Sequence, residues 1–563
     1  MTLRLDPQQR AAALRRLRAE AFDIVVVGGG VTGAGVALDA ATRGLSVAVV
    51  ERRDWAAGTS SRSSKLIHGG LRYLEQLNVG LVREALRERG LLLEELAPHL
   101  VRPVPFMYPL SRRYVERPYV GVGLALYDTL GGARRGIPRH RHWSKRKALQ
   151  VNPGLDPGAL VGAVRYYDAQ LDDARHTLLL ARTALDHGAV AATRVEVTGL
   201  LRAAGRVAGV RVRDRLTGDE HEVRARAVVN ATGPWSDQVQ RLAGASPVQV
   251  RPSKGIHFLV PRERLNLRTG LILRTEQSVL FVIPWQDCWL IGTTDTPWDH
   301  DVDEPPPHRG DIDYLLERVN AVLADPITPA DILGVFAGLR PLIAAAGEGE
   351  ATARLSREHR VDESPPGLFS VTGGKYTTYR VIARDTVDAV AATLGRAVPS
   401  SCTERVPLLG AAGYHARVNE RPRLARDTGL HRGWINHLLG RYGDLVTELV
   451  ELMAATPELA RPLEGAPGYL RVEARYAASH EGALSVEDVL ARRTRAAFET
   501  RDRGLEAARA VAELIAEPLG WDGTRVNEEV ERFRAFTEAA LRAEAETTDE
   551  AAIAARGSLV DPT

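Results

Sequence analysis

The run Phe22-Asp23-Ile24-Val25-Val26-Val27 leads directly into Gly28-Gly29-Gly30-Val31-Thr32-Gly33, and this stretch decides the fold. The β-branched run predicts a strand buried on both faces, as strands of parallel sheets are. A helical stretch over 34–43 follows the glycines, Gly44 ends it, and 45–51 predicts a second strand. Together these elements form a βαβ unit, the context in which a G-x-G-x-x-G turn binds a dinucleotide.

Each residue of the turn has a physical task. Gly28 allows the tight turn, Gly30 lets the backbone approach a pyrophosphate, and Gly33 lets the helix pack on the sheet. Thr32 lies at the helix N-terminus, where amide N–H groups and the helix dipole attract phosphate. Glu51 ends the second strand, 18 residues after Gly33, where a carboxylate can accept hydrogen bonds from ribose hydroxyls.

Two distant segments extend this site. Residues 227–236 predict a strand that runs into a turn of small residues, and 370–379 predict a strand, a Gly-Gly turn and a helix start. A helix N-terminus there can hold the edge of a flavin ring on which negative charge collects during reduction. Three separated segments that close on one nucleotide favour FAD over NAD.

Composition limits the other function classes. The 563 residues predict two or three domains, with a boundary near 399–406, after which helical patterns replace strands. The net charge of +3 gives no reason to expect a nucleic-acid partner. Cys288 and Cys402 predict two reduced thiols, and no ligand spacing indicates a metal. We expect neither a secretory signal nor a transmembrane helix, and therefore an intracellular protein.

Several motifs now identify a resemblance. The stretch Thr59-Ser60-Ser61-Arg62-Ser63-Ser64-Lys65-Leu66-Ile67-His68-Gly69-Gly70-Leu71-Arg72-Tyr73-Leu74 resembles a signature of the FAD-dependent, quinone-linked glycerol-3-phosphate dehydrogenases. Segments 229–235, 291–295, 338–342 and 373–379 resemble the same family, and 488–495 resembles its helical domain. The similarity is strong over about 20–385 and looser beyond.

The resemblance implies an α/β fold, α+β overall, with three parts. These are a Rossmann-type two-dinucleotide-binding FAD domain, an antiparallel-sheet substrate domain of the D-amino-acid-oxidase type, and a C-terminal α-helical domain. The expected division is a basic helix at 1–21, FAD segments at 22–75, 190–245 and 335–395, substrate segments at 76–189 and 246–334, and the helical domain at 401–563.

The resemblance also implies an activity: oxidation of sn-glycerol 3-phosphate to dihydroxyacetone phosphate by hydride transfer from C2 to non-covalent FAD, with electrons passed to membrane quinone. His68 is the first choice for the base and His257 the second. Arg340 is expected to bind the substrate phosphate in a forked geometry, assisted by Arg72 and Lys375.

Lysine is scarce in the chain, yet Lys65, Lys254 and Lys375 all fall inside or beside these motifs, which favours chemistry at those positions. Tyr73 completes the expected catalytic group. The expected cofactor-binding residues are Gly28, Gly30, Thr32, Gly33, Glu51, Arg52, Thr59, Ser63, Ser64, Lys65, Leu66, His68, Val195, Ala231, Thr232, Gly233, Trp235, Gly292, Asp295, Gly374, Lys375, Tyr376 and Thr377.

Two basic segments are compatible with a membrane surface. The helix expected near the start carries several arginines, and 111–147 holds ten Arg or Lys against Glu116 and Asp128, interleaved with Tyr and Trp. A capping helix and a solvated loop are the simpler interpretations. We expect peripheral attachment to the inner face of the cytoplasmic membrane, and the sequence leaves a homodimer open.

Three alternative functions remain. An oxidase would run the same half-reaction with O₂ as acceptor, and no residue distinguishes it. An amine or amino-acid oxidase on the same fold would need a carboxylate clamp in place of Arg340, Arg72 and Lys375. A catalytically inactive flavin-binding scaffold would have no use for His68, Arg340 and Lys375.

Overall fold

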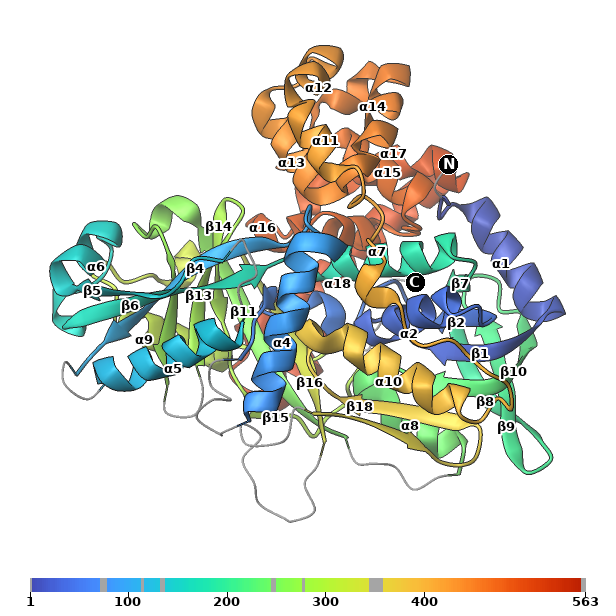
Figure 1. Cartoon of the computed structure of the whole chain (residues 1–563). Helices are drawn as coiled ribbons and strands as arrows, with labels where there is room; N and C mark the ends of the chain where they lie inside the picture. The colour runs from blue at the N-terminus through green and yellow to red at the C-terminus, as the bar shows by residue number, and fades with distance from the viewer. Residues whose placement is uncertain are drawn as a thin grey trace.

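The computed structural model of the chain describes residues 3–70, 78–112, 116–131, 137–244, 250–275, 279–343 and 358–557. Two sheets lie side by side, and a group of helices stands above them (Figure 1). Within those ranges no helix is long and apolar enough to cross a membrane. Arg72 and Tyr73 lie outside the described residues.

The first sheet contains the βαβ unit and places the three expected segments next to one another. In spatial order its strands are β17 (His359–Glu363), β18 (Leu368–Gly373), β10 (Glu220–Asn230), β1 (Ala21–Val27), β2 (Val47–Glu51) and β7 (Val190–Thr193). From β18 to β7 the strands are parallel, and Val27, Asn230 and Ser370 lie in register, so the carboxyl ends of these strands meet at one edge. Ligands of open parallel sheets bind at that edge.

Both faces of this sheet are covered, which explains why β1, β2 and β7 are almost continuously buried. On one face lie α2 (Val31–Thr42), α7 (Asp173–Asp186) and α10 (Tyr379–Ala391). The other face is covered by α1 (Pro7–Ala19), α8 (Ser236–Leu242) and the hairpin of β8 (Val195–Ala203) and β9 (Arg206–Asp214). Arg10 of α1 is ion-paired with Asp214 at 2.8 Å, so the basic helix docks on the sheet.

The second sheet is mixed but mostly antiparallel. Its path is β15 (Thr296–Pro297), β11 (Val250–Pro261), β14 (Cys288–Gly292), β13 (Val279–Trp285), β12 (Gly270–Arg274), β4 (Arg102–Leu110), β6 (Gly162–Gln170) and β3 (Leu66–Ile67), with β16 (Gly334–Ile343) beside β11 and β5 (Arg141–Ser144) beside β6. The helices on this side of the molecule are α4 (Val79–Leu91), α5 (Glu116–Leu130), α6 (Lys145–Val151) and α9 (Arg309–Asn320).

The chain crosses between the two sheets at points that differ from the expected segment bounds. Helix α7 packs on α2 beside the first sheet, although 76–189 was assigned to the substrate domain. Strands β3 and β16 lie in the second sheet, although 22–75 and 335–395 were assigned to FAD segments. An apolar pattern shows that a segment is buried, but it does not show against which of the two sheets the segment packs. The points at which the chain passes from one sheet to the other therefore could not be predicted from the sequence.

The C-terminal part is helical, and the predicted three-part architecture is confirmed. Its helices are α11 (Tyr414–Asn419), α12 (Arg421–Thr428), α13 (Arg432–Tyr442), α14 (Val446–Ala455), α15 (Arg471–His480), α16 (Ala496–Glu499), α17 (Leu505–Leu519), α18 (Gly523–Ala545) and α19 (Asp549–Arg556), with a short ribbon of β19 (Pro462–Leu463) and β20 (Ala466–Leu470). Buried ion pairs join it to the first domain, among them Arg493–Asp54 at 2.6 Å and Arg194–Asp488 at 2.9 Å.

Gly33 tests the packing of the βαβ turn. A Cβ atom at Gly33 would lie 1.9 Å from the carbonyl oxygen of Gly28, so Gly33→Ala must push α2 away from the turn. We expect the free energy of unfolding, measured by urea denaturation, to fall by about 1–3 kcal/mol. Gly80→Ala is the matched control, because a Cβ on this α4 glycine would meet open space; it should leave stability equal or raise it by up to about 1 kcal/mol. Equal unfolding midpoints for the two variants would contradict this account of the turn.

Candidate active site

A cavity of about 670 Å³ opens where the strands of the first sheet end and the second sheet begins. Its volume is in the range of about 300–1,000 Å³ that is usual for small-molecule sites. Its walls come from the β1–α2 turn, the loop after β2, the turn after β10, strands β11 and β16, and the turn after β18. Segments more than 300 residues apart in sequence therefore share one site.

The glycine turn has the geometry that a dinucleotide requires. Gly28 adopts φ +110°, and a Cβ there would lie 2.8 Å from the carbonyl oxygen of Ala231. Oε2 of Glu51 accepts a hydrogen bond from the Gly29 amide at 2.6 Å, so its carboxylate lies at the turn. The N-terminus of α2 faces the cavity at Thr32. These residues fit a bound dinucleotide with its pyrophosphate at the helix N-terminus.

An aromatic and cationic group forms the wall beyond Glu51. The indole of Trp235 lies beneath the guanidinium groups of Arg52 and Arg53, at 5.6 and 5.2 Å from the ring centroid. Asp303 accepts hydrogen bonds from the Trp235 indole N–H and from Arg52, the latter at 2.7 Å. This wall offers a flat apolar face and fixed charges next to the position expected for a ribose.

Most of the expected site residues line the cavity together. They are Gly28, Gly30, Thr32, Glu51, Arg52, Thr59, Ser63, Ser64, Leu66, His68, Val195, Ala231, Thr232, Gly233, Trp235, His257, Arg340, Gly374, Lys375, Tyr376 and Thr377. Gly33, Lys65, Gly292 and Asp295 lie behind the wall rather than in it.

His257 is held firmly on β11. The side chain is buried, its Nε2 lies 2.8 Å from Oγ of Ser64, and its ring stacks on Phe336 with centroids 5.1 Å apart. Burial, with the positive charges of Arg340 and Lys65, lowers the pKa of His257 well below its usual value. The imidazole is therefore neutral at physiological pH and keeps one unprotonated ring nitrogen, although the lowered pKa makes it a weaker base than an exposed histidine.

Arg340 lies on β16, opposite Ser253 of β11. Its guanidinium donates to Oγ1 of Thr293 at 3.0 Å and to the carbonyl of Thr294 at 3.1 Å, and Asp295 lies 3.2 Å from Nη1. These contacts fix the orientation of the Arg340 guanidinium, and the Arg340 side chain lines the cavity. Asp295 thus acts on the site through Arg340.

Gly292 also acts through a neighbour. A Cβ at Gly292 would lie 2.3 Å from Cδ2 of His257, so only glycine leaves room for the imidazole ring. Gly255 does the same for Arg340, because a Cβ there would lie 2.6 Å from its Nη2. Sequence reasoning placed Gly292 beside the cofactor, whereas the structure places it beneath His257.

His68 and Lys375 line the cavity from adjacent segments. The backbone amide of His68 donates a hydrogen bond to Oγ1 of Thr377 at 3.2 Å, so the segment around His68 is bonded to the turn after β18. Gly373 and Gly374 adopt φ +71° and +84°, a conformation that places Lys375 at the start of the following helix.

Lys65 and Lys254 have structural roles. Lys65 is buried and ion-paired with Asp173 at 3.0 Å, and burial together with Arg495 lowers its pKa to about 8. Lys254 lies between Asp311, at 2.7 Å, and Asp549. The expectation of chemistry from scarce lysines therefore matches the cavity only at Lys375.

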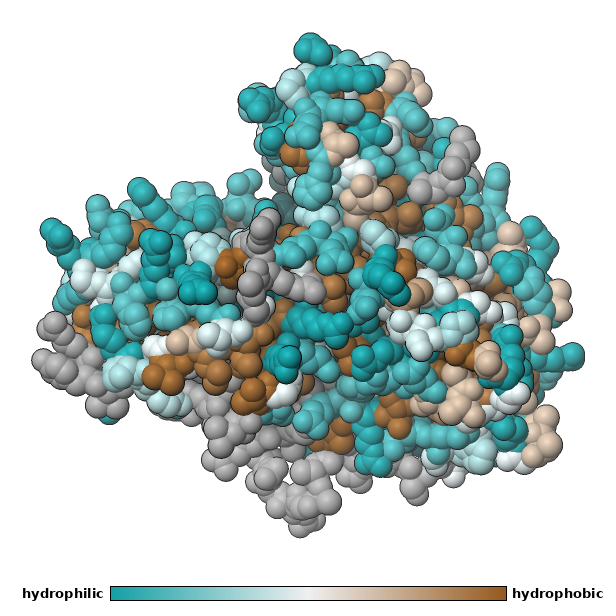
Figure 2. Space-filling view, in the orientation of Figure 1, coloured by the Kyte–Doolittle hydropathy of each residue, from teal (hydrophilic) through white to brown (hydrophobic). Residues whose placement is uncertain are grey.

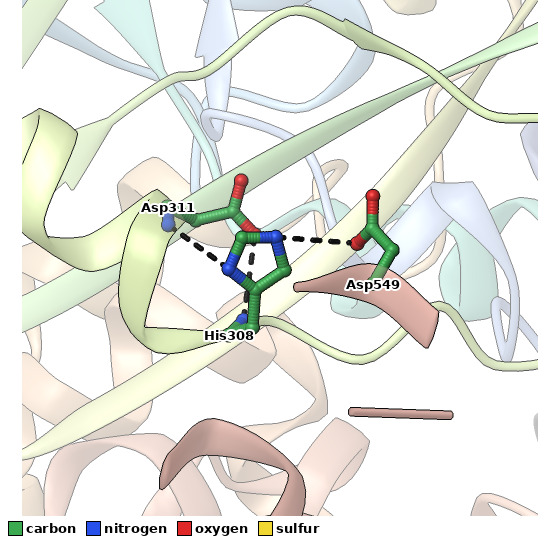
Figure 3. Close-up of side chains that lie close together, drawn as sticks. All are labelled: His308, Asp311 and Asp549. Atoms are coloured by element: carbon green, nitrogen blue, oxygen red, sulfur yellow. Dashed lines mark hydrogen bonds and ion pairs between the residues drawn. The ribbon is translucent and has the colours of Figure 1, made fainter. Parts of the chain in front are cut away.

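His308, Asp311 and Asp549 gather their ligand atoms within 4.8 Å, as a cation site would (Figure 3). The backbone amide of Asp311 donates to Nδ1 of His308, which puts the ring proton on Nε2, facing Asp549 at 3.4 Å. Because the Lys254 ammonium is ion-paired with both carboxylates, the group is an ion-pair cluster that ties α19 to α9 and β11.

Sequence reasoning missed several cavity residues. Arg62 lies in the quoted signature and lines the cavity, with its guanidinium 5.4 Å from the Phe498 ring. Ser60 accepts a hydrogen bond from the Val31 amide at 2.9 Å and so caps α2. Thr198 and Arg213 come from the β8–β9 hairpin, where Val195 was the expected cofactor-binding residue.

Comparisons with known proteins identify the family of both parts of the chain. Residues 23–389 match the family model of FAD-dependent oxidoreductases, and 401–526 match that of the C-terminal domain of alpha-glycerophosphate oxidase. The chain is 53% identical over 555 residues to glycerol-3-phosphate dehydrogenase 2 of Mycobacterium tuberculosis, covering 98% of this chain and 94% of the relative. It is 38% identical to the human mitochondrial glycerol-3-phosphate dehydrogenase, covering 94% of this chain and 75% of that protein.

Solved structures give the same result. The glycerol-3-phosphate dehydrogenase of Bacillus halodurans, solved in complex with FAD, superposes with a TM-score of 0.78 at 30% identity, over 96% of this chain and 99% of that one. The L-alpha-glycerophosphate oxidase of Mycoplasma pneumoniae has a TM-score of 0.54 at 19% identity, over 69% of this chain and 99% of that one, and so shares the fold.

Proposed function

This chain belongs to the glycerol-3-phosphate dehydrogenases of the FAD-dependent oxidoreductase family, and from that premise we propose that it oxidises sn-glycerol 3-phosphate to dihydroxyacetone phosphate. The observation that carries this proposal is one cavity that joins a dinucleotide turn at Gly28 to a neutral imidazole, His257, and an oriented guanidinium, Arg340. When bound, FAD supplies the acceptor for the hydride that leaves C2.

The cavity wall provides the contacts for non-covalent FAD. We assign the pyrophosphate to the Gly28–Thr32 turn, the ribose to Glu51, and the nucleotide face to Trp235. The turn at 373–377 lies beside His68, and the helix start there suits the flavin edge that gains negative charge.

Arg340 is assigned to the substrate phosphate. Its guanidinium is charged at all physiological pH values and is oriented by Thr293 and Thr294, so it presents fixed donors to a dianion. Lys375 lines the same cavity and adds a second cation. Such fixed charges favour a phosphate ester over the free alcohol.

We assign the base to His257 rather than to His68. The C2 hydroxyl proton needs an acceptor close to the phosphate-binding group, and His257 and Arg340 lie on the paired strands β11 and β16. The hydroxyl of Ser64, 2.8 Å from Nε2, fixes the orientation of the His257 ring. His68 also lines the cavity, so it is the alternative candidate for the base.

We further propose that the acceptor is membrane quinone and that α5 rests on the inner face of the cytoplasmic membrane. Tyr119, Val122 and Leu126 are 55%, 71% and 40% exposed, and at this spacing they share one helix face. Figure 2 shows this apolar patch over the position of α5 in Figure 1. Strand β5 lies beside α5, since a Cβ at Gly121 would lie 3.0 Å from His142, and its neighbours 139–147 are mostly exposed and basic. Apolar insertion flanked by cations is typical of proteins that bind anionic membranes.

An O₂-dependent oxidase is the second candidate. The family model matched by residues 401–526 is named for alpha-glycerophosphate oxidase, which is the observation in its favour. The two candidates share substrate, cofactor and base, so only the oxidative half-reaction separates them.

Rapid mixing of the FAD-loaded protein with glycerol 3-phosphate should bleach the flavin absorbance, whereas glycerol at the same concentration should not. Arg340→Ala removes charge-assisted hydrogen bonds of about 1.5–3 kcal/mol each, so KM should rise about 100-fold or more while FAD stays bound. No bleaching at millimolar substrate would contradict the proposed substrate. Loss of FAD from Arg340→Ala would show that this arginine supports the fold instead.

His257→Asn should slow flavin reduction at saturating substrate by about 100-fold or more, because general-base catalysis contributes roughly 10²–10⁴ in rate. His68→Asn is the matched variant, since both residues line the cavity. A larger loss in His68→Asn than in His257→Asn would transfer the role of the base to His68.

Val122→Glu combined with Leu126→Glu should weaken cosedimentation with phosphatidylserine-containing vesicles by at least about tenfold, because it replaces inserted apolar groups with anions. Leu216→Glu with Ile553→Glu is the control, since these residues are exposed and apolar but lie outside α5. The wild-type protein should reduce a vesicle-embedded quinone with little peroxide. Equal vesicle binding of the two double variants would contradict the role of α5, and stoichiometric peroxide would favour the oxidase.

A further inference from the structure

We propose that the C-terminal helical domain shapes the active site through one ion pair, Arg495–Asp173, and that these two are positioning residues for the reaction. The kinetic consequence rests on the proposed function, whereas the structural consequence does not. Neither residue lines the cavity, and each acts through segment 61–65, of which Arg62, Ser63 and Ser64 line the cavity.

Asp173 contacts three parts of the structure: Ser63 in the cavity wall, Arg495 of the helical domain, and Tyr376 in the turn after β18. Its carboxylate is fully buried at the start of α7. Oδ2 accepts hydrogen bonds from Ser63, at 2.6 Å from Oγ and 3.0 Å from the amide, while Oδ1 binds Lys65 Nζ at 3.0 Å and Arg495. Its backbone carbonyl accepts a bond from the Tyr376 hydroxyl at 2.7 Å.

These contacts determine the shape of the wall on both sides of Ser64. The Lys65 amide donates to Oγ of Ser63 at 3.0 Å, and Lys65 adopts φ +58°, an unusual conformation for a residue with a side chain. Asp173 holds both neighbours of Ser64, and the Ser64 hydroxyl in turn lies 2.8 Å from Nε2 of His257. The direction of the Ser64 hydroxyl therefore depends on Asp173.

Arg495 connects this arrangement to the helical domain. Its side chain is 1% exposed, and Nη1 donates to the carbonyl of Ser61 at 3.3 Å, next to the segment that Asp173 holds. Nη2 bonds Asp172 at 2.6 Å as well as Asp173. Two adjacent buried carboxylates repel each other, and the guanidinium of Arg495 binds both, while Lys65 also pairs with Asp173 and Arg441 lies 3.6 Å from Asp172. Arg495 thus fixes the position of Asp173 and the path of 61–65 together.

Other contacts hold the two domains together. Arg493 binds Asp54 at 2.6 and 2.7 Å, and Arg175 binds Glu481 at 2.7 Å. Substitution of Arg495 should therefore leave the helical domain docked and change mainly the wall segment. Arg493 is the matched control, because it is equally buried, lies two residues away and also holds a carboxylate, but that carboxylate binds Arg492 and Arg493 and not Ser63.

The test compares Arg495→Lys, Arg495→Met and Arg493→Lys in the full chain, with hydrogen–deuterium exchange of a peptide covering 59–70 as the main measurement. Arg495→Met should raise exchange there about tenfold, both with and without FAD, which corresponds to about 1.4 kcal/mol. Arg495→Lys keeps one charged contact and should recover part of the protection. Arg493→Lys should leave this peptide unchanged, even where it lowers Tm.

Glycerol 3-phosphate kinetics form the second arm. Arg495→Lys should lower kcat about tenfold with KM within about twofold, because the base loses its orientation while the phosphate site remains. Equal exchange of 59–70 in Arg495→Lys, Arg493→Lys and wild type would overturn the proposal. A wild-type protein that glycerol 3-phosphate fails to reduce would overturn the proposed function but leave the exchange result to judge this inference.

Discussion

Buried guanidinium–carboxylate pairs between the helical domain and the first sheet are the constraint on which the rest of the structure depends. Arg492 and Arg493 both bind Asp54, and Arg175 binds Glu481, all with side chains at most 5% exposed. Removing such charges from water costs several kcal/mol per ion, and a lost partner leaves a buried charge uncompensated. These pairs therefore hold the start of the loop after β2, at Asp54, against the helical domain.

The loop after β2 connects the two sheets and supplies several of the residues that line the cavity. It leaves the first sheet at β2 and reaches the second sheet at β3. Along this path the Thr59 hydroxyl donates to the carbonyl of Leu339 at 2.6 Å, and Ser64 meets His257. The first bond orients the strand that carries Arg340, and the second orients the imidazole. The dinucleotide half and the substrate half are thus joined by hydrogen bonds between the segments that line the cavity.

Where the constraints are local, the sequence located the segments that line the cavity. The βαβ unit, Glu51 and the turn after β10 follow from strand patterns, glycines and spacing, because those constraints act within a few residues. The tasks of Gly292 and Asp295 were not predictable in the same way. Gly292 makes room for His257, and Asp295 binds Arg340, and both partners lie on other strands. A sequence motif shows that such a residue is present but does not show which distant side chain it contacts.

The lysines show the same limit. Lys65 and Lys254 stand in or beside the motifs, yet both are neutralised by aspartates from distant helices. Nothing in the local sequence identifies those partners. The exposed face of α5 was missed for a related reason, since a basic segment with aromatic residues is equally compatible with a solvated loop until the helix phase of Tyr119, Val122 and Leu126 is known.

The C-terminal part of the chain also stabilises the end of the cavity at which Arg52 and Trp235 lie. Glu304 binds Arg53 at 2.5 Å and lies 3.6 Å from Arg556 of α19, while its neighbour Asp303 holds Arg52 and Trp235. Lys254 of β11 is ion-paired with Asp549 of α19, which is one of the residues drawn in Figure 3. One end of the helical domain therefore fixes the loop beneath the nucleotide wall, and Arg495 reaches the wall beside His257. None of the described residues that line the cavity comes from this domain, yet its charged groups hold segments at both ends of the site and so help to determine its shape.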